Sequence, residues 1–187
     1  MKIVCISGKA RHGKDTAANY MRKKLELSGK KVLVAHYADL LKYICKTIFN
    51  WNGVKDENGR QLSQYVGTDV IREQNPDYWV DFIIGILDMF YGDWDYVLIP
   101  DCRFPNEVER LKEADFDTVS VKIVRDDFVS KLTEEQKNHK SETAMDNFDF
   151  DFVIHNRDMG GFYKNLNQLL IDIEAEVSEN EEIQSVS

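Results

Sequence analysis

Short apolar segments alternate with segments of helical periodicity along most of the chain. The apolar runs at 2–7, 31–37, 96–100, 118–124 and 150–155 predict buried β-strands. Helical spacing is found at 14–28, 38–49, 60–73, 75–92, 106–114 and 161–176. In the helix at 75–92, we expect Asn75 to be the N-cap and Pro76 the first helical residue. The alternation predicts an α/β fold, a five-stranded parallel sheet with helices on both faces.

Length and composition suit a single globular domain without a membrane span. The chain has 187 residues, and no apolar run approaches the ~20 residues that a spanning helix needs. Its three cysteines are widely spaced and indicate neither a disulfide framework nor a zinc site, so we expect a cytoplasmic protein. A formal charge of −9 argues against general nucleic-acid binding. The acidic residues 178–187 are expected to be a solvated tail.

The stretch "ISGKARHGKDT", residues 6–16, has the pattern of a loop that binds nucleoside triphosphate. Gly8 and Gly13 allow the backbone N–H groups to point inward, and Lys14 follows them at the start of a helix. Asp15 stands where such loops usually carry Ser or Thr, and its carboxylate is a suitable oxygen ligand for Mg²⁺, directly or through water. The alternative is a plain strand-to-helix turn with a glycine hinge.

A second group of polar residues follows the predicted strand at 96–100. Asp101 comes at its carboxyl end, where it would lie beside the loop and hold Mg²⁺ or orient an arginine. Arg103 has a planar guanidinium suited to bidentate phosphate contact. Glu107 is open to two interpretations, because an acid in a first helical turn is also favourable without any function.

A third group lies in the predicted helical segment between the second and third strands. It combines hydrogen-bond donors with a charge pair: Arg60, Gln64, Thr68, Asp69 and Arg72. Gly67 within the helical pattern indicates a helix end or a close backbone approach. This segment would grip a second substrate. Taken alone, the segment is more typical of a polar surface helix, and Trp79 is more typical of a core residue.

Together these stretches resemble the deoxynucleoside-monophosphate kinases of bacteriophages, within the P-loop nucleotide kinases. The shared motifs run in one order over about residues 1–175: Gly-x4-Gly-Lys-Asp-Thr from Gly8, Leu-x-Gln-x-x-Gly-Thr-Asp from Leu62, Tyr-Trp-Val from Tyr78, Pro-Asp-x-Arg-x-x-x-Glu from Pro100, His-x-Ser-Glu from His139 and Val-Ile-x-Asn from Val153. The resemblance implies a three-layer P-loop kinase fold over residues 1–177, and it makes Asp15 an expected residue.

The resemblance also implies roles for individual residues. The ATP phosphates and base would be held by Arg11, His12, Gly13, Lys14, Asp15, Thr16 and Asn156. The acceptor nucleotide would be bound by Leu41, Lys42, Arg60, Gln64, Gly67, Thr68, Trp79, Asp101, Arg103 and Glu107. Lys14, Asp15, Arg11 and Arg103 would be catalytic, and Asp15 and Asp101 would serve Mg²⁺.

Two larger segments acquire roles in the same way. Residues 38–92 would form a helical monophosphate-binding insertion, and 125–145 a lid. The lid has a single arginine, Arg125, so Lys131, Lys137 and Lys140 would supply its remaining positive charge. A homodimer and, for a viral protein, the cytoplasm of an infected host are further implications.

The expected reaction is Mg²⁺-assisted transfer of the ATP γ-phosphoryl group to a deoxynucleoside monophosphate. Two alternatives stay open from the sequence. One is a P-loop kinase with another phosphorylated acceptor, such as dephospho-coenzyme A or an isoprenoid precursor. The other is a nucleotide-dependent switch or ATPase, which would consume ATP without phosphorylating an acceptor.

Overall fold

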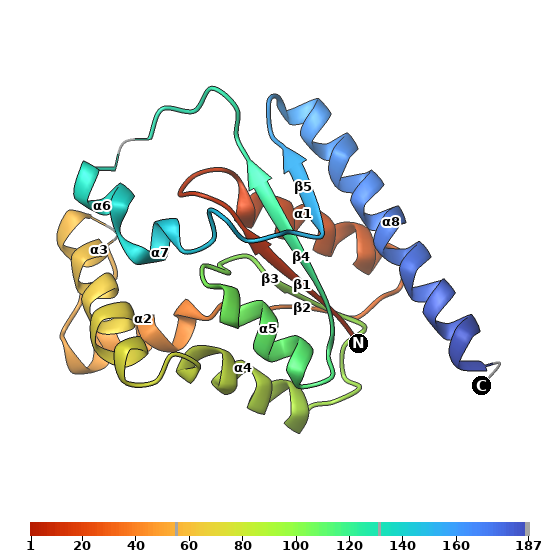
Figure 1. The fold of residues 1–187 in the computed structure, drawn as a ribbon, viewed down its shortest axis with the longest axis horizontal. Coiled ribbons are helices and arrows are strands. Elements are labelled where there is room, and N and C mark those ends of the chain that lie inside the picture. Colours follow the sequence, from red (N-terminus) through yellow and green to blue (C-terminus); the bar gives the residue numbers. More distant parts are fainter. Residues whose placement is uncertain (55, 131, 186–187) are drawn as a thin grey trace.

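The five predicted strands form one parallel sheet in a computed structural model of the chain. The structure describes residues 1–54, 56–130 and 132–185, with side chains as far as residue 175. The strand order is β2–β3–β1–β4–β5 (Figure 1). The strands are β1 Lys2–Ser7, β2 Val32–Val34, β3 Tyr96–Ile99, β4 Asp117–Val124 and β5 Phe152–His155.

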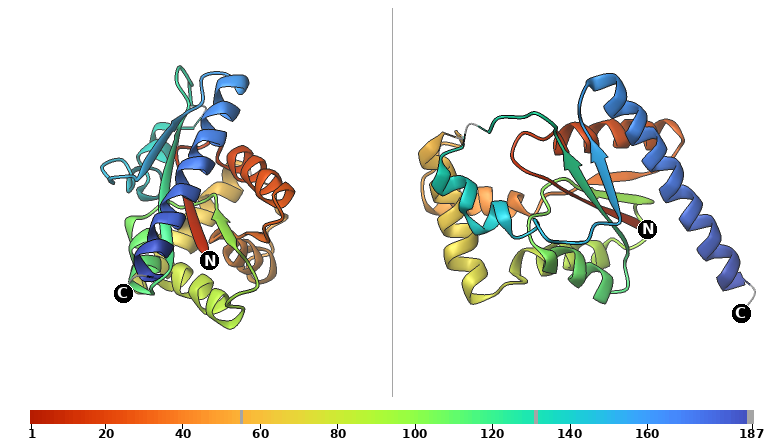
Figure 2. Two further views of the ribbon diagram at one scale, coloured as in Figure 1. Left: turned by 90° about the vertical axis from the view of Figure 1, so that its right-hand side faces the viewer. Right: turned by 45° about the horizontal axis from the view of Figure 1, so that its top comes forward.

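Helices cover both faces of this sheet, as predicted, and give the fold three layers (Figure 2). One face packs against α1 and α8, and the other packs mainly against α4 and α5. The helical elements are α1 Lys14–Leu27, α2 Ala38–Ile48, α3 Glu57–Gln64, the π-helix η1 Tyr65–Arg72, α4 Tyr78–Met89, α5 Pro105–Glu113, α6 Glu134–Asn138, α7 Lys140–Thr143 and α8 Met159–Ser185.

The central strand β1 shows why its sequence is apolar throughout. Ile3 and Cys5 enter the core beneath α4 and α5, while Val4 and Ile6 enter the core beneath α1 and α8. All four are completely buried, because successive strand residues point to opposite faces and both faces are covered. The sheet therefore fixes the position of the loop that follows β1.

Helix α4 begins later than the sequence predicts. Its N-cap is Asp77 and its first residue is Tyr78, so the assignment of Asn75 and Pro76 to the helix start is wrong. The Asn75 side chain instead accepts a hydrogen bond from the Asp77 N–H. The Pro76 carbonyl accepts hydrogen bonds from the side chains of Arg72 and Asn106. These contacts fix the turn that precedes α4.

Two other predicted helices also differ from the structure. The single helix expected at 60–73 is α3 followed directly by η1, in which hydrogen bonds have π-helical spacing. The last helix continues to Ser185 rather than ending near residue 176. The side chains beyond residue 175 and residues 186–187 lie outside the described part, so the solvated tail stays a prediction.

The carboxyl ends of the strands meet at one edge of the sheet, where ligands bind in such folds. The loop after β1, the segment after β3 and the lid after β4 all begin there (Figure 1). The expected insertion is helical, since α2, α3, η1 and α4 lie between β2 and β3. None of the described helices combines the length and apolar content needed to cross a membrane.

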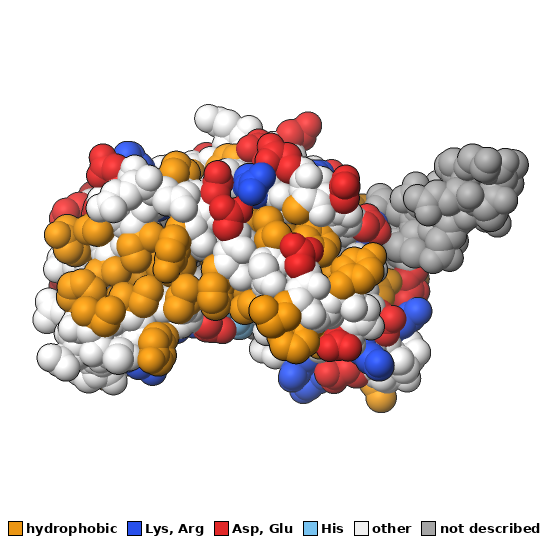
Figure 3. All heavy atoms as spheres, turned by 90° about the horizontal axis from the view of Figure 1, so that it is seen from below, with side chains coloured by type: hydrophobic (Ala, Val, Ile, Leu, Met, Phe, Trp, Pro, Cys, Tyr) orange, Lys and Arg blue, Asp and Glu red, His pale blue; other side chains and the backbone are white. Residues whose placement is uncertain are grey.

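A broad apolar surface lies on the side of the molecule formed by the helical insertion. Figure 3 shows hydrophobic side chains gathered there, seen from below the view of Figure 1. The exposed apolar residues of α2 and α4 include Tyr43, Ile48, Phe82 and Met89. Helix α4 packs into the core through Trp79 and Val80, which are buried, and exposes Phe82 and Met89.

Candidate functional site

The loop between β1 and α1 has the geometry of an anion-binding site. Gly8 and Gly13 have φ angles of 141° and 107°, which side chains disfavour. A Cβ atom on Gly8 would lie 2.4 Å from the Ile123 carbonyl oxygen. The N-cap residue of α1 is Gly13, which has no side chain to cap the first turn, so the positive end of this helix can face an anion. These features fit a bound triphosphate.

Lys14 holds its ammonium group inside this loop. Its Nζ donates hydrogen bonds to the carbonyls of Gly8, at 2.6 Å, and Lys9, at 3.0 Å. Burial, followed by the positive charge of Arg103, lowers the pKa of Lys14 from its ordinary 10.5 to about 8. The loop therefore holds a cation whose charge is poorly balanced, which favours a bound phosphate.

The other predicted ATP residues surround the loop. The Asn156 side chain donates to the His12 carbonyl at 2.9 Å, and it lies against Gly13. The His12 ring meets the Ile123 carbonyl and the Arg125 N–H, and burial lowers the pKa of His12. Arg11 adopts a left-handed backbone conformation with φ 65° and is exposed. Asn156 thus braces the loop itself, and its contact with the donor base stays a prediction.

Asp15, Thr16 and Asp101 lie at the same edge but in different surroundings. Asp15 and Thr16 are exposed in the first turn of α1, and an Asp15 oxygen lies 3.6 Å from His36 Nε2. The Asp101 carboxylate accepts the N–H groups of Tyr37, at 3.1 Å, and Ala38, at 3.0 Å. Burial raises the pKa of Asp101, and these bonds oppose that change. Asp101 therefore fixes the start of α2.

This arrangement fits Mg²⁺ only as a partner of the nucleotide. The described residues contain no group of three or more His, Cys, Asp or Glu side chains able to hold a metal ion. Asp15 has a carboxylate that is 79% exposed beside the loop, whereas both Asp101 oxygens already accept backbone hydrogen bonds. Phosphate and water oxygens would have to complete the coordination.

One cavity of about 220 Å³ brings together all the residues predicted to bind the acceptor. These are Leu41, Lys42, Arg60, Gln64, Gly67, Thr68, Trp79, Asp101, Arg103 and Glu107. At its wall, the Trp79 indole N–H donates to the Gly67 carbonyl at 3.0 Å. A Cβ atom on Gly67 would lie 2.7 Å from a Leu41 methyl carbon. The expected close approach at Gly67 is confirmed, and the expected helix end is not.

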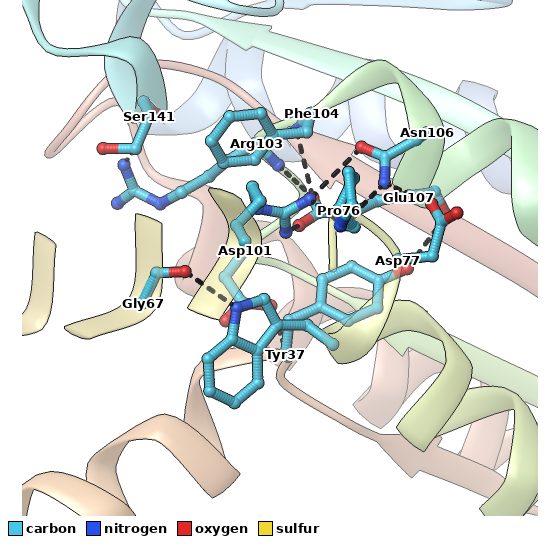
Figure 4. A network of polar contacts seen from close by, with 12 residues as sticks. Tyr37, Gly67, Pro76, Asp77, Asp101, Arg103, Phe104, Asn106, Glu107 and Ser141 are labelled. Atoms are coloured by element: carbon cyan, nitrogen blue, oxygen red, sulfur yellow. Dashed lines mark hydrogen bonds and ion pairs between the residues drawn. The ribbon is translucent and has the colours of Figure 1, made fainter. Parts of the chain in front are cut away.

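Glu107 lines this cavity and belongs to a network of polar contacts at its wall (Figure 4). One carboxylate oxygen accepts from Arg72 Nη2 at 2.5 Å, and the other accepts the N–H groups of Arg103 and Phe104. Arg72 also donates to Pro76 and Asn106 and lies 3.9 Å from the centre of the Phe104 ring. Burial raises the pKa of Glu107, and Arg72 opposes the change. Glu107 thus fixes the backbone that carries Arg103.

The lid segment contacts the site through acidic and main-chain groups. Arg103 Nη1 forms an ion pair with Glu142 and donates to the Ser141 carbonyl at 3.1 Å. The positive charge expected of the lid is directed elsewhere: Lys137 pairs with Glu134, and Arg125 lies 5.0 Å from the centre of the Phe128 ring. Lys140 is exposed, and Lys131 lies outside the described residues.

Comparison with known proteins identifies the family. A profile of the deoxynucleotide monophosphate kinase family matches residues 28–165, well over half of the chain. The chain belongs to this family. The kinase fold has solved counterparts at low sequence identity. Among curated proteins, no sequence matches this kinase significantly.

Two solved structures illustrate the shared fold. Shikimate kinase from Aquifex aeolicus has 14% identity and a TM-score of 0.50, over 95% of this chain and 98% of its own. The APS kinase of Mycobacterium tuberculosis, in complex with AMPPNP and APS, has 12% identity and a TM-score of 0.50. That match covers 92% of this chain and 97% of the other. The P-loop kinase fold predicted from the sequence is confirmed.

Several residues that line the cavity around Trp79 and Arg103 were not among those predicted to bind the acceptor. They are Tyr37, Ala38, Trp51, Gly59, Ser63, Arg72, Phe104, Ser141 and Glu142. Two of them could have been found from the sequence, since Arg72 belongs to the third polar group and Glu142 ends the His-x-Ser-Glu motif. Trp51 could not, because the connection between α2 and α3 has no regular hydrophobic pattern. Its indole N–H donates to the Val54 carbonyl at 3.1 Å.

Proposed function

We propose that this kinase transfers the γ-phosphoryl group of ATP to a deoxynucleoside monophosphate and so produces the diphosphate. The observation that carries the proposal is the meeting of two sites at Arg103. Arg103 lines the acceptor cavity, and its charge acts on Lys14 in the triphosphate loop. A phosphoryl group held by Lys14 would therefore lie within reach of an acceptor phosphate held by Arg103.

The chemistry suits a site without a strong general base. The second pKa of a phosphate monoester is about 6, so the acceptor oxygen is already ionised at neutral pH. Catalysis then consists of alignment and of stabilising charge on the transferring group. The loop N–H groups and Lys14 would hold the donor phosphates, and Arg103, with Arg11, would neutralise the phosphoryl charge. Arg60, Gln64, Thr68 and Trp79 would hold the acceptor nucleoside in the cavity.

Mg²⁺ belongs to this proposal as the partner of ATP. Asp15 would hold it together with phosphate oxygens, and the bound ion neutralises charge on the β- and γ-phosphates. Asp101 would act mainly by fixing the start of α2, where Lys42 and Leu41 border the cavity. Closure of the lid over 125–145 would exclude water and suppress hydrolysis of ATP.

A homodimer is the second part of the proposal. It is supported by the family resemblance and by the apolar surface over α2 and α4 (Figure 3). A contiguous apolar surface of this kind favours association with another protein surface. Light scattering after size-exclusion chromatography measures the mass directly, and a mass near 21.8 kDa would reject the dimer.

The activity is tested by ADP release with Mg-ATP and each deoxynucleoside monophosphate in turn. The matching ribonucleotides and a blank without acceptor complete the set. We expect turnover that requires an acceptor. Equal release in the blank would instead indicate an ATPase or switch, and turnover with only another phosphorylated acceptor would reassign the substrate.

Two variants test the assignment of Arg103. Arg103→Ala should lower turnover at least about 100-fold, the order of loss seen when one charge-stabilising donor is removed. Arg110→Ala is the control, because Arg110 lies on the same segment but pairs with Asp81 and Glu113 outside the cavity. Unchanged acceptor affinity and turnover in Arg103→Ala would remove Arg103 from the mechanism.

A further inference from the structure

Glu142 lies where the lid, the triphosphate loop and the acceptor cavity meet. Its carboxylate pairs with Arg103 Nη1, and its side chain is only 8% exposed. Its main-chain carbonyl accepts a hydrogen bond from Lys9 Nζ, and Lys9 also pairs with Asp146. The lid helix α7 is therefore attached through one residue both to the arginine of the acceptor site and to the loop of the donor site.

The lid contacts the Arg103 guanidinium at one end. Nη1 contacts Glu142 and the Ser141 carbonyl, and the Arg103 side chain reaches toward Ser141 in Figure 4. Nε and Nη2 make no hydrogen bond with any of the described residues, and the Arg103 side chain is 38% exposed. A planar guanidinium held at one end presents its other donors in a fixed direction. Those donors are suited to a phosphate.

One carboxylate holds the main chain of Arg103, and a second carboxylate holds its side chain. Glu107 accepts the Arg103 backbone N–H at 2.6 Å, and Glu142 accepts from the guanidinium. A phosphate that approaches Nε and Nη2 does not have to displace Glu142, which contacts Nη1. The contacts of Arg103 and Lys9 with α7 also include main-chain carbonyls, those of Ser141 and Glu142. These main-chain contacts do not depend on what the Glu142 carboxylate binds.

We propose that Glu142 is a positioning residue, which orients the Arg103 guanidinium for phosphate contact when the lid lies against the site. The inference rests on the proposed function. In this arrangement, lid placement and the geometry of the arginine depend on each other. Arg103 is held in its productive orientation only while α7 lies over the cavity. Phosphoryl transfer then requires the same closure that excludes water.

The decisive experiment is a double-mutant cycle between Glu142 and Arg103. Glu142→Ala should lower kcat about 10- to 100-fold, the range expected when a reacting group is misplaced by about 1 Å. Glu142→Gln keeps an oxygen acceptor and should therefore lower kcat less than Glu142→Ala does. In an Arg103→Lys background, Glu142→Ala should change kcat less than about twofold, because the partner it positions is gone. Glu134→Gln, at an exposed lid residue that pairs with Lys137, should leave kcat unchanged.

Arginine side-chain ¹⁵N NMR gives a readout that needs no turnover. The Arg103 signals are assigned by their absence in Arg103→Lys. They should show hindered rotation about the guanidinium bonds in the wild type and in Glu134→Gln, and averaged signals in Glu142→Ala. Circular dichroism confirms that each variant is folded.

Three results would overturn the proposal. One is an unchanged or raised kcat in Glu142→Ala, which would make the carboxylate a competitor of phosphate. Another is an equal loss on Glu142→Ala in the wild-type and Arg103→Lys backgrounds, and the third is an Arg103 signal that does not respond to Glu142. Failure of the proposed function looks different: the wild type itself would phosphorylate no deoxynucleoside monophosphate, while the NMR comparison would still report on Glu142.

Discussion

Lys14 provides the sharpest test of the site, because the residue proposed to bind the ATP phosphates should also destabilise the ligand-free protein. In the ligand-free kinase, the ammonium is held by two loop carbonyls within a largely buried setting. Methionine has a similar length and no charge. We expect Lys14→Met to abolish turnover and, at the same time, to increase the free energy of unfolding of the ligand-free protein.

The size of the effect follows from the pKa. Burial and Arg103 lower the pKa of Lys14 from 10.5 to about 8, and one pKa unit corresponds to about 1.4 kcal/mol. Folding therefore opposes the charged ammonium by about 3 kcal/mol. Methionine removes that opposition but leaves two loop carbonyls without their donor, which costs about 1 kcal/mol for each carbonyl. The net gain is about 1–2 kcal/mol, or about 2–8 °C in Tm for a chain of this size.

The pH dependence of the unfolding free energy tests the sign of this effect independently. Between pH 8 and 10.5, the unfolded chain keeps a proton on Lys14 that the folded protein has released, so the stability of the wild type gains from rising pH. The difference between Lys14→Met and wild type should therefore be largest near pH 7 and shrink between pH 8 and 10. Other groups with shifted pKa values, such as Tyr96, are present in both proteins and cancel.

Urea unfolding followed by circular dichroism, at several pH values and without ligand, measures this difference. Lys23→Met is the control, since Lys23 is an exposed residue of the same helix, and it should change stability by no more than about 0.5 kcal/mol. The reasoning is refuted if Lys14→Met is less stable than wild type by about 1 kcal/mol or more. A stability difference that stays constant from pH 7 to pH 10 would refute it equally.

Two further substitutions and one control test the proposed acceptor cavity and the residue that supports its wall. Gly67→Ala places a Cβ atom 2.7 Å from the Leu41 methyl carbon and pushes that side chain into the cavity, so steady-state kinetics should show an acceptor KM raised about 10-fold. Gly85→Ala, with nothing within 4 Å, should leave KM unchanged and stabilise the protein by up to about 1 kcal/mol. Glu107→Gln leaves the buried Arg72 charge unpaired and should lower the unfolding free energy by about 3–5 kcal/mol in urea. A loss below about 1 kcal/mol would show that the pair is dispensable.

The central strands of the sheet could be predicted from the sequence because they are buried on both faces. Continuous apolar runs such as residues 2–7 and 118–124 are typical of strands in a covered parallel sheet when helical segments separate them. The element ends were less predictable, and α4 shows why. The turn at Asn75 and Pro76 is set by Arg72 and by Asn106 of a distant helix, and no local pattern reports those contacts.

The members of the site were predictable for a related reason. Residues that follow β1, β2 and β3 meet at one edge of the sheet, because the strands are parallel. Lys14, Leu41 and Arg103 were therefore expected at the same edge. The helical residues Arg60, Gln64 and Thr68 depended on the family resemblance, because their placement follows from how α3 and η1 pack. The structure brings them into the same cavity.

What the sequence could not provide is the pairing of two arginines with two acids. Spacing along the chain does not tell whether Glu107 serves Arg72 or Arg103, or that Glu142 lies near either. In the structure, the Arg72 guanidinium meets Glu107, Pro76 and Asn106, so its charge is used to build the wall. Arg103 keeps donors that no described residue uses. Tertiary packing therefore gives Arg72 a structural role and leaves donors of Arg103 unused by the described residues, which is why Arg103 rather than Arg72 is the residue to test first for phosphate binding.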